Sequence, residues 1–155
     1  MRTFWMAVMA LFSGPALAQD IVATLYTHNG TVAPPYHRNL RALVAADGMV
    51  TLRACKGYGD SDCVTLSGPA PQGAVAAILA AAGVAGLPGR PLAEDPMPPV
   101  GGGATSGSVV IEGQTVALPA FPAEADRART NDVLAAIQAA IPADLQTRAA
   151  AKMRE

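Results

Sequence analysis

The chain has few of the residues that most catalytic and metal sites require. Among its 155 residues are two cysteines, two histidines and one tryptophan, and aromatic residues make up 5%. Zinc sites need several His, Cys or carboxylate ligands at close spacing, whereas His28 and His37 stand at opposite ends of a proline-containing segment. We therefore expect ordinary histidines at the edges of a loop. If that loop closes on itself, the alternative is a metal-binding or pH-sensing pair.

Patterns that accompany other chemistry are missing too. The sequence has no G-x-S-x-G motif for a serine nucleophile. Gly101-Gly102-Gly103 lacks the Gly-Lys-Ser/Thr that completes a phosphate-binding loop, so we interpret it as a flexible spacer. The acids at 60 and 62 lack the pattern and terminal Glu of an EF-hand, and are expected to be solvated. The sequence predicts neither an enzyme nor a site for a metal or another cofactor.

Neither sign of charge dominates the chain. Eleven Lys and Arg residues stand against twelve Asp and Glu residues, for a net charge of −1. Proteins that bind nucleic acid usually carry a basic patch or stripe. This balance therefore predicts no nucleic-acid partner.

Long apolar runs are absent beyond the first residues. The apolar stretch 4–12 is about half of the ~20 residues that a membrane-spanning helix needs. A positive residue precedes it, and Ala16-Leu17-Ala18 follows as an A-x-A cleavage pattern. We predict a signal peptide over residues 1–18, and a periplasmic or secreted protein that is not inserted in a membrane after cleavage.

The two cysteines lie close together, at Cys55 and Cys63. In an oxidising compartment a nearby pair favours a disulfide, which would hold the irregular Gly-Tyr-Gly segment between them. A redox-active pair is the alternative, but it would need C-x-x-C spacing and neighbouring cations, which this pair lacks. We predict a structural disulfide.

Alternating apolar residues predict strands in the first half of the mature chain. The first expected strand covers 21–27, and a loop over 28–37 follows. Residues 38–46 and the run after Asp47-Gly48 predict a hairpin, because Asp-Gly favours a two-residue turn. The side chains expected to face the core are Leu40, Ala42, Val44, Val50, Leu52 and Ala54.

The second half combines helices with another hairpin. We expect a helix over 72–82, a Pro/Gly-rich loop over 87–107, a hairpin around 112–114 and a helix over 123–141. Their apolar faces hold Val75, Ile78, Leu79, Ala82, Val109, Ile111, Val116, Leu118, Val133, Leu134, Ile137 and Ile141. A proline then precedes a polar helical tail over 143–155, expected to be the least well packed element.

This order of elements predicts one α+β domain over 19–142. Its antiparallel sheet should have four or five strands, because a short run at 64–66 can extend it. Two main helices should pack on one face of that sheet.

The loop over 28–37 has features of a recognition edge. A Pro-Pro pair stiffens it, and an Asn-Gly pair lies near its start. A stiff loop loses less entropy on binding, and Tyr36 and Tyr58 offer aromatic anchors. The alternative is a plain connection in which the prolines limit flexibility and proteolysis.

The order of elements resembles that of emfourin, a family of small bacterial inhibitors of thermolysin-like metalloproteases. The segment Leu25-Tyr26-Thr27-His28-Asn29-Gly30 corresponds to the family's first strand and the small-residue loop after it. The other corresponding pieces are the strand pair 38–55, the helix 72–86 with Leu87-Pro88, the hairpin 108–118 and the helix that carries Leu134 and Ile137.

This resemblance implies inhibition by occlusion, without covalent chemistry. The loop 28–33 would enter the protease cleft and pair its backbone with the substrate-binding edge. The resemblance favours Asn29, Gly30 and Thr31 as contacts, and Val32 and Tyr36 of the same loop complete the predicted partner-binding set. The alternative is a periplasmic binding or scaffold module that uses the loop 87–107 as its contact surface.

Overall fold

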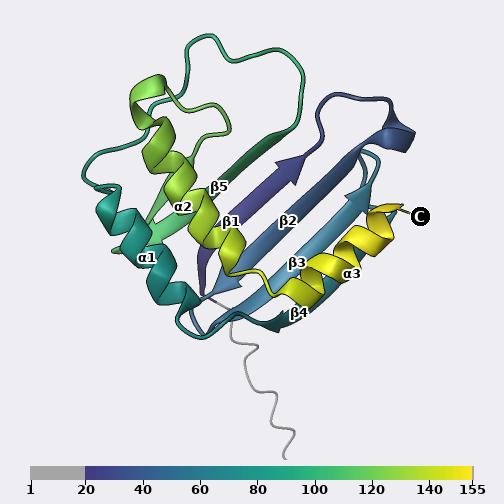
Figure 1. The fold of residues 1–155 in the computed structure, drawn as a ribbon, viewed down its shortest axis with the longest axis horizontal. Helices are drawn as coiled ribbons and strands as arrows, with labels where there is room; N and C mark the ends of the chain where they lie inside the picture. The colour runs from purple at the N-terminus through teal and green to yellow at the C-terminus, as the bar shows by residue number, and fades with distance from the viewer. Residues whose placement is uncertain (1–19, 155) are drawn as a thin grey trace, which may run out of the picture.

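The computed structural model describes residues 20–154, which form one antiparallel sheet with helices on one face (Figure 1). The strands are β1 (Ile21–His28), β2 (Arg38–Ala45), β3 (Met49–Lys56), β4 (Cys63–Pro69), β5 (Ala104–Ile111) and β6 (Gln114–Leu118). The helices are α1 (Ala74–Val84), α2 (Arg127–Ala139) and α3 (Ala143–Arg154), with short 3-10 turns at η1 (Pro34–Tyr36) and η2 (Glu124–Asp126). The predicted signal peptide lies outside the described residues.

The strands are arranged in the order β4-β3-β2-β1-β5-β6. The first four form a meander, and β5 pairs with the other side of β1 after the chain has formed α1. The α+β class is confirmed. Within residues 20–154 the predicted four or five strands become six and the two main helices become three, because 63–69 is a full strand and the C-terminal segment packs as a helix.

Both predicted hairpins are present, and their turns explain their register. In the first, the Asp47 carboxylate accepts a hydrogen bond from Met49 N–H at 2.9 Å, and Gly48 has a φ of 83°. In the second, Glu112 and Gly113 have φ values of 51° and 75°. Two successive residues at positive φ match the twist of the flanking strands.

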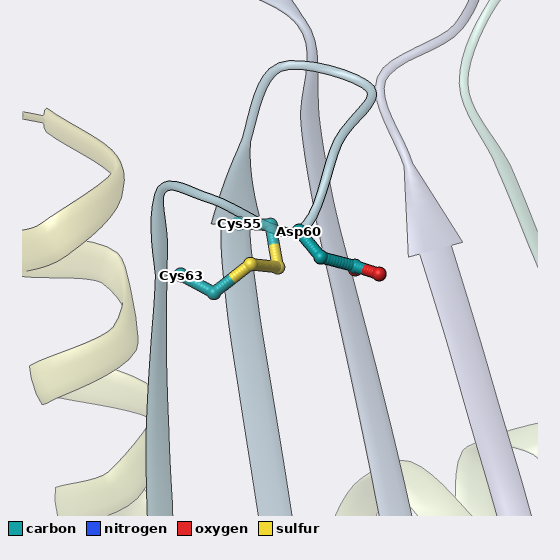
Figure 2. A group of neighbouring side chains, drawn as sticks. All are labelled: Cys55, Asp60 and Cys63. Atoms are coloured by element: carbon teal, nitrogen blue, oxygen red, sulfur yellow. A yellow bond between two sulfur atoms is a disulfide. The ribbon is translucent and has the colours of Figure 1, made fainter.

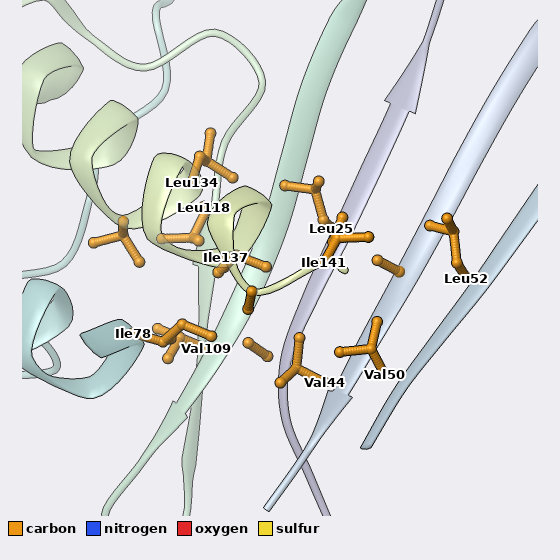
Figure 3. Close-up of a cluster of buried hydrophobic side chains, with 14 of the residues drawn as sticks. Leu25, Val44, Val50, Leu52, Ile78, Val109, Leu118, Leu134, Ile137 and Ile141 are labelled. Carbon is orange, nitrogen blue, oxygen red and sulfur yellow. The ribbon is translucent and has the colours of Figure 1, made fainter. Parts of the chain in front are cut away.

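The core lies between the sheet and the helices (Figure 3). Inward-facing side chains alternate with outward-facing ones along each strand, as the pleat requires. Large buried side chains are Leu25, Val44, Val50, Leu52, Val109 and Leu118 from the sheet, and Ile78, Val133, Ile137 and Leu145 from the helices. Burial of one such side chain contributes about 1.5–3 kcal/mol, so this layer is the main source of stability.

Helix α1 differs in part from its predicted packing. Ile78 and Ala82 are buried, and Val75 packs at the edge of the core, but Leu79 is exposed. The helix packs mainly against α2 rather than lying flat on the sheet. Its buried stripe is therefore narrower than the sequence pattern predicts.

Helix α3 packs on the same core, whereas the sequence predicts a polar tail that follows the domain over 19–142. Leu145 and Ala149 are almost fully buried against β3 and β4. Figure 1 shows α3 over these two strands, beyond the part of the sheet that α2 covers.

The chain between α1 and β5, residues 85–103, forms a long loop that we call the flap. The predicted loop over 87–107 is wrong at its end, because β5 already begins at Ala104. Pairing with β1 explains this start: Ala104 lies opposite His28, and the hydroxyls of Thr27 and Thr105 are 3.1 Å apart.

Asp126 anchors the first half of the flap. Its carboxylate accepts a hydrogen bond from Ala93 N–H at 3.0 Å and pairs with Arg129, which also donates to the carbonyl oxygens of Ala85 and Arg90. The hydrogen bond from Ala93, followed by the contact with Arg129, holds the pKa of Asp126 below its ordinary value.

None of the helices within residues 20–154 has the length and apolar character needed to cross a bilayer.

Candidate functional site

Three loops gather at one end of the sheet and form what we call the loop cluster, residues 29–37, 57–62 and 97–103. They lie where β1, β3 and the chain before β5 reach the upper edge of the sheet in Figure 1. The first two loops are joined by a backbone hydrogen bond from Gly57 N–H to the carbonyl of His37 at 2.9 Å. The first and third meet at Gly30 and Gly102.

Asn29 closes the first of these loops. Its backbone N–H donates to the Arg38 carbonyl at 3.1 Å, and its side-chain oxygen accepts from Arg38 N–H at 2.8 Å. Its side-chain nitrogen donates to the Tyr36 carbonyl at 2.8 Å. One asparagine therefore holds both arms of the loop.

Gly30 is a supporting residue beneath the flap. It is buried with a φ of 96°, a conformation that side chains disfavour. A Cβ atom there would lie 2.4 Å from the carbonyl oxygen of Gly102. Its N–H donates to Nδ1 of His28 at 3.0 Å. A larger residue at this position would therefore separate the loop from the flap.

Thr31, Val32 and Tyr36 face solvent. The side chain of Tyr36 is 70% exposed and that of Val32 is 36% exposed. The structure thus places all five predicted partner-binding residues in one loop. Asn29 and Gly30 maintain its shape, whereas the other three present their side chains outward.

The two histidines lie near each other below this loop. Their ring centroids are 6.2 Å apart, and His37 is stacked on Tyr58 at 3.9 Å. His37 is buried, and its Nδ1 donates to the Gly57 carbonyl at 2.9 Å. No third metal-ligating side chain joins them among the described residues. Their visible role is to support the loop, together with the Tyr58 hydroxyl, which donates to the Val32 carbonyl at 2.7 Å.

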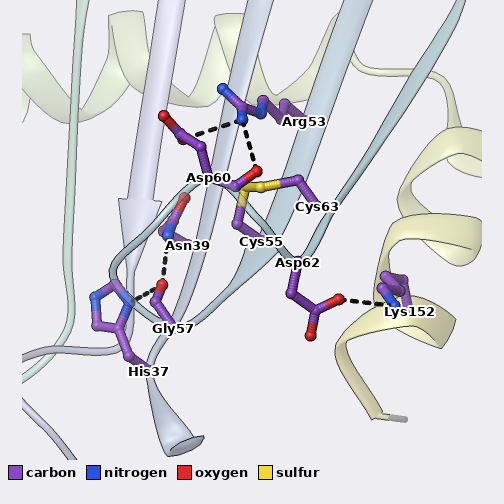
Figure 4. The surroundings of a disulfide bond; sticks show 9 residues. All are labelled: His37, Asn39, Arg53, Cys55, Gly57, Asp60, Asp62, Cys63 and Lys152. Atoms are coloured by element: carbon purple, nitrogen blue, oxygen red, sulfur yellow. Dashed lines mark hydrogen bonds and ion pairs between the residues drawn. A yellow bond between two sulfur atoms is a disulfide. The ribbon is translucent and has the colours of Figure 1, made fainter. Parts of the chain in front are cut away.

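The predicted disulfide is confirmed. Cys55 and Cys63 lie opposite each other on β3 and β4, with their Cα atoms 4.1 Å apart (Figure 4). Asp60 lies close to both sulfur atoms (Figure 2). Metal ions bind cysteine as the thiolate, and these sulfurs are bonded to each other. The group therefore offers a metal only the carboxylate of Asp60.

Asp60 and Asp62 are exposed, as the sequence predicts, and each also forms an ion pair. Asp60 pairs with Arg53 at 3.0 Å, and Asp62 pairs with Lys152 of α3 at 3.0 Å. The hydrogen bond from Lys152 holds the pKa of Asp62 below its ordinary value. Arg38 adds a second link to α3, because its Nε donates to the Met153 carbonyl at 3.0 Å.

Sequence analysis missed two arginines on the uncovered face of the sheet. Arg41 and Arg53 lie directly opposite each other on β2 and β3. Their register follows from the Asp47-Gly48 turn, so counting outward from this turn would have paired them.

No model of a known protein family and no curated protein matches this chain.

Proposed function

We propose that the protein is an exported, non-catalytic binding protein that inserts the loop 29–37 into the cleft of a partner. The leading candidate partner is a thermolysin-type metalloprotease, which the loop would inhibit by occlusion. The observation that carries the proposal is a pre-shaped loop that presents Thr31, Val32 and Tyr36 outward.

Preorganisation supports this role. Hydrogen bonds from Asn29, Arg38 and Tyr58 hold the loop from both sides. A loop already held in shape loses less conformational entropy when it binds. An exposed tyrosine is also among the residues that most often anchor a protein interface.

The bonding of the loop suggests how it would recognise a partner. The Val32 carbonyl accepts from Tyr58, and the Ala33 carbonyl accepts from the N–H groups of Tyr36 and His37. Since these oxygens already have partners, we assign recognition mainly to the exposed side chains rather than to backbone pairing. No residue of the loop forms a covalent bond with the target.

Export is the second part of the proposal. Disulfides persist in oxidising compartments, and the Cys55–Cys63 bond supports a periplasmic or secreted location. The predicted signal peptide agrees with this location.

The test is a titration of oxidised residues 19–155 against a protease panel that includes a thermolysin-like enzyme. We expect stoichiometric inhibition, weakened at least about 30-fold by Tyr36→Ser if this side chain is an anchor worth about 2 kcal/mol. Gly30→Leu should weaken inhibition by displacing the loop from Gly102. The matched control is Val84→Ser, which removes an exposed apolar side chain from α1. Absence of inhibition by the folded protein would reject the protease target.

The flap supports a second candidate, a scaffold module for another envelope protein. Met97 is 83% exposed and Val100 is fully exposed, next to the Gly102 contact. In this case Met97→Ser with Val100→Ser should abolish capture of the partner, while Tyr36→Ser leaves it intact. The opposite result would favour the loop 29–37.

A further inference from the structure

The face of the sheet that points away from the helices carries a row of large polar side chains. Tyr26 of β1 lies opposite Arg41 of β2, and Arg41 lies opposite Arg53 of β3. The three side chains thus stand side by side across neighbouring strands. Like charges placed directly opposite each other in a sheet are destabilising, so the two arginines need an explanation.

The two guanidinium groups have different surroundings. Arg53 pairs with the Asp60 carboxylate at 3.0 Å and donates to the Asp60 carbonyl at 3.4 Å (Figure 4). Arg41 lies over the ring of Tyr26, with its guanidinium carbon 5.6 Å from the ring centroid. Asp60 therefore forms an ion pair with Arg53, whereas the contact described for Arg41 is with the ring of Tyr26.

A hollow of about 220 Å³ lies between these groups, bordered by Tyr26, Asn39, Arg41, Arg53, Tyr58 and Asp60. Pockets for drug-sized ligands measure about 300–1,000 Å³. This hollow therefore suits a single small group rather than a large ligand. Its aromatic walls and two guanidinium groups define the chemistry of that group as a small organic anion.

We propose that this hollow binds a carboxylate, held between Arg41 and Arg53. Guanidinium groups bind carboxylates through two parallel hydrogen bonds, which adds geometric specificity to the charge. Asp60 shows that Arg53 accepts a carboxylate at this position, through a single contact between Nη2 of Arg53 and Oδ1 of Asp60 at 3.0 Å. Its side chain is 85% exposed, so an incoming carboxylate can displace it from Arg53 at small cost, as expected for a surface ion pair.

The hollow is continuous with the loop cluster through Tyr58. This tyrosine borders the hollow, stacks on His37 and bonds to the Val32 carbonyl. A partner that contacts the loop 29–37 can therefore place an acidic side chain in the hollow. The carboxylate site does not depend on the proposed function, since a free carboxylate can be tested on the protein alone.

The test is an NMR titration of the folded protein, residues 19–155, with acetate, with a blocked glutamate peptide and with inorganic phosphate. We expect saturable shifts of the β2 and β3 amides around Arg41 and Arg53. Affinity should fall about tenfold or more in Arg41→Gln and in Arg53→Gln, as expected for loss of a charge-assisted bond. It should rise a few-fold in Asp60→Asn, which removes the internal competitor.

The control is Arg127→Gln, another surface arginine, which pairs with Glu124 and lies at the start of α2, on the helical side of the sheet (Figure 1). It should bind the carboxylates as the natural protein does. Tighter binding of the peptide than of acetate supports an acidic side chain as the natural ligand, and equal binding supports a small free acid. Shifts that are absent, that weaken equally in Arg127→Gln, or that are stronger with phosphate than with either carboxylate would overturn the proposal.

Discussion

The two faces of the sheet differ in burial: one packs against the helices, and the other is open to solvent. On the face toward the helices, Leu25, Val44 and Leu52 are fully buried. On the opposite face, their sequence neighbours Tyr26 and Arg53 border an open hollow. Because side chains alternate along a strand, the same strands supply stability on one face and binding groups on the other. Residues adjacent in sequence should therefore respond very differently to substitution.

The largest contrast should come from neighbouring residues of β3. Leu52→Ala creates a cavity in the core and should lower the free energy of unfolding by about 2–5 kcal/mol. Thr51→Ala, on the opposite face, loses a hydroxyl contact with Ser67 and some β-propensity, and should lower it by about 1 kcal/mol or less. Urea unfolding followed by circular dichroism measures both variants. Similar losses in the two would mean that the outer face is also covered.

Loss of the disulfide should have the next largest effect on the free energy of unfolding. Replacing Cys55 and Cys63 by serine should cost about 2.5 kcal/mol, from the unfolded-state entropy of a short closed loop. Thermal unfolding of the oxidised natural protein, the reduced natural protein and the double variant gives the comparison. The reduced natural protein and the double variant should have similar stabilities. A double variant as stable as the oxidised protein would contradict this role.

The smallest expected change in stability comes from Asp126, on the helical side of the sheet. Its folded-state pKa is lowered, chiefly by the hydrogen bond from Ala93. The resulting stabilisation is therefore fully present above the ordinary pKa of an aspartate and is lost as the pH falls through the lowered value. Asp126→Asn should be less stable than the natural protein near neutral pH, and the difference should shrink as the pH falls below the ordinary pKa of an aspartate.

Unfolding curves at several pH values test this prediction. The matched control is Asp132→Asn, which changes an exposed acid on α2. Because this side chain is exposed, the substitution should change the stability near neutral pH by less than about 0.5 kcal/mol. A difference between Asp126→Asn and the natural protein that stays constant down to acid pH would show that charge is not the cause.

Local patterns predicted the elements whose structure is set by short-range rules. The Asp47-Gly48 turn and the alternating residues around it define the first hairpin. The strand at 63–69 and the full extent of β5 were less visible, because their serines, threonines and glycines have a weak apolar pattern. The extent of these two strands is set by the strands that they pair with, β3 for β4 and β1 for β5, and not by their own sequence pattern.

Long-range packing explains the other differences. A polar helix with only Leu145 and Ala149 on its buried side has too few apolar residues to predict docking. Likewise, the meeting of Gly30 with Gly102 depends on how the flap returns to β5. In the loop 28–37, the sequence predicts the position of the loop but cannot separate the residues that shape it from those that are exposed.

The position of α3 has a practical consequence for handling the protein. Its last turn is joined to Asp62 of the loop cluster through Lys152, and to Arg38 at the start of β2 through Met153. A tag or surface attachment at the C-terminus would therefore crowd the candidate binding edge. Strand β1 begins at Ile21 at the opposite end of the sheet (Figure 1). Attachment on the side of β1 where Ile21 lies would leave the loops facing outward, and is the better orientation for immobilised binding assays.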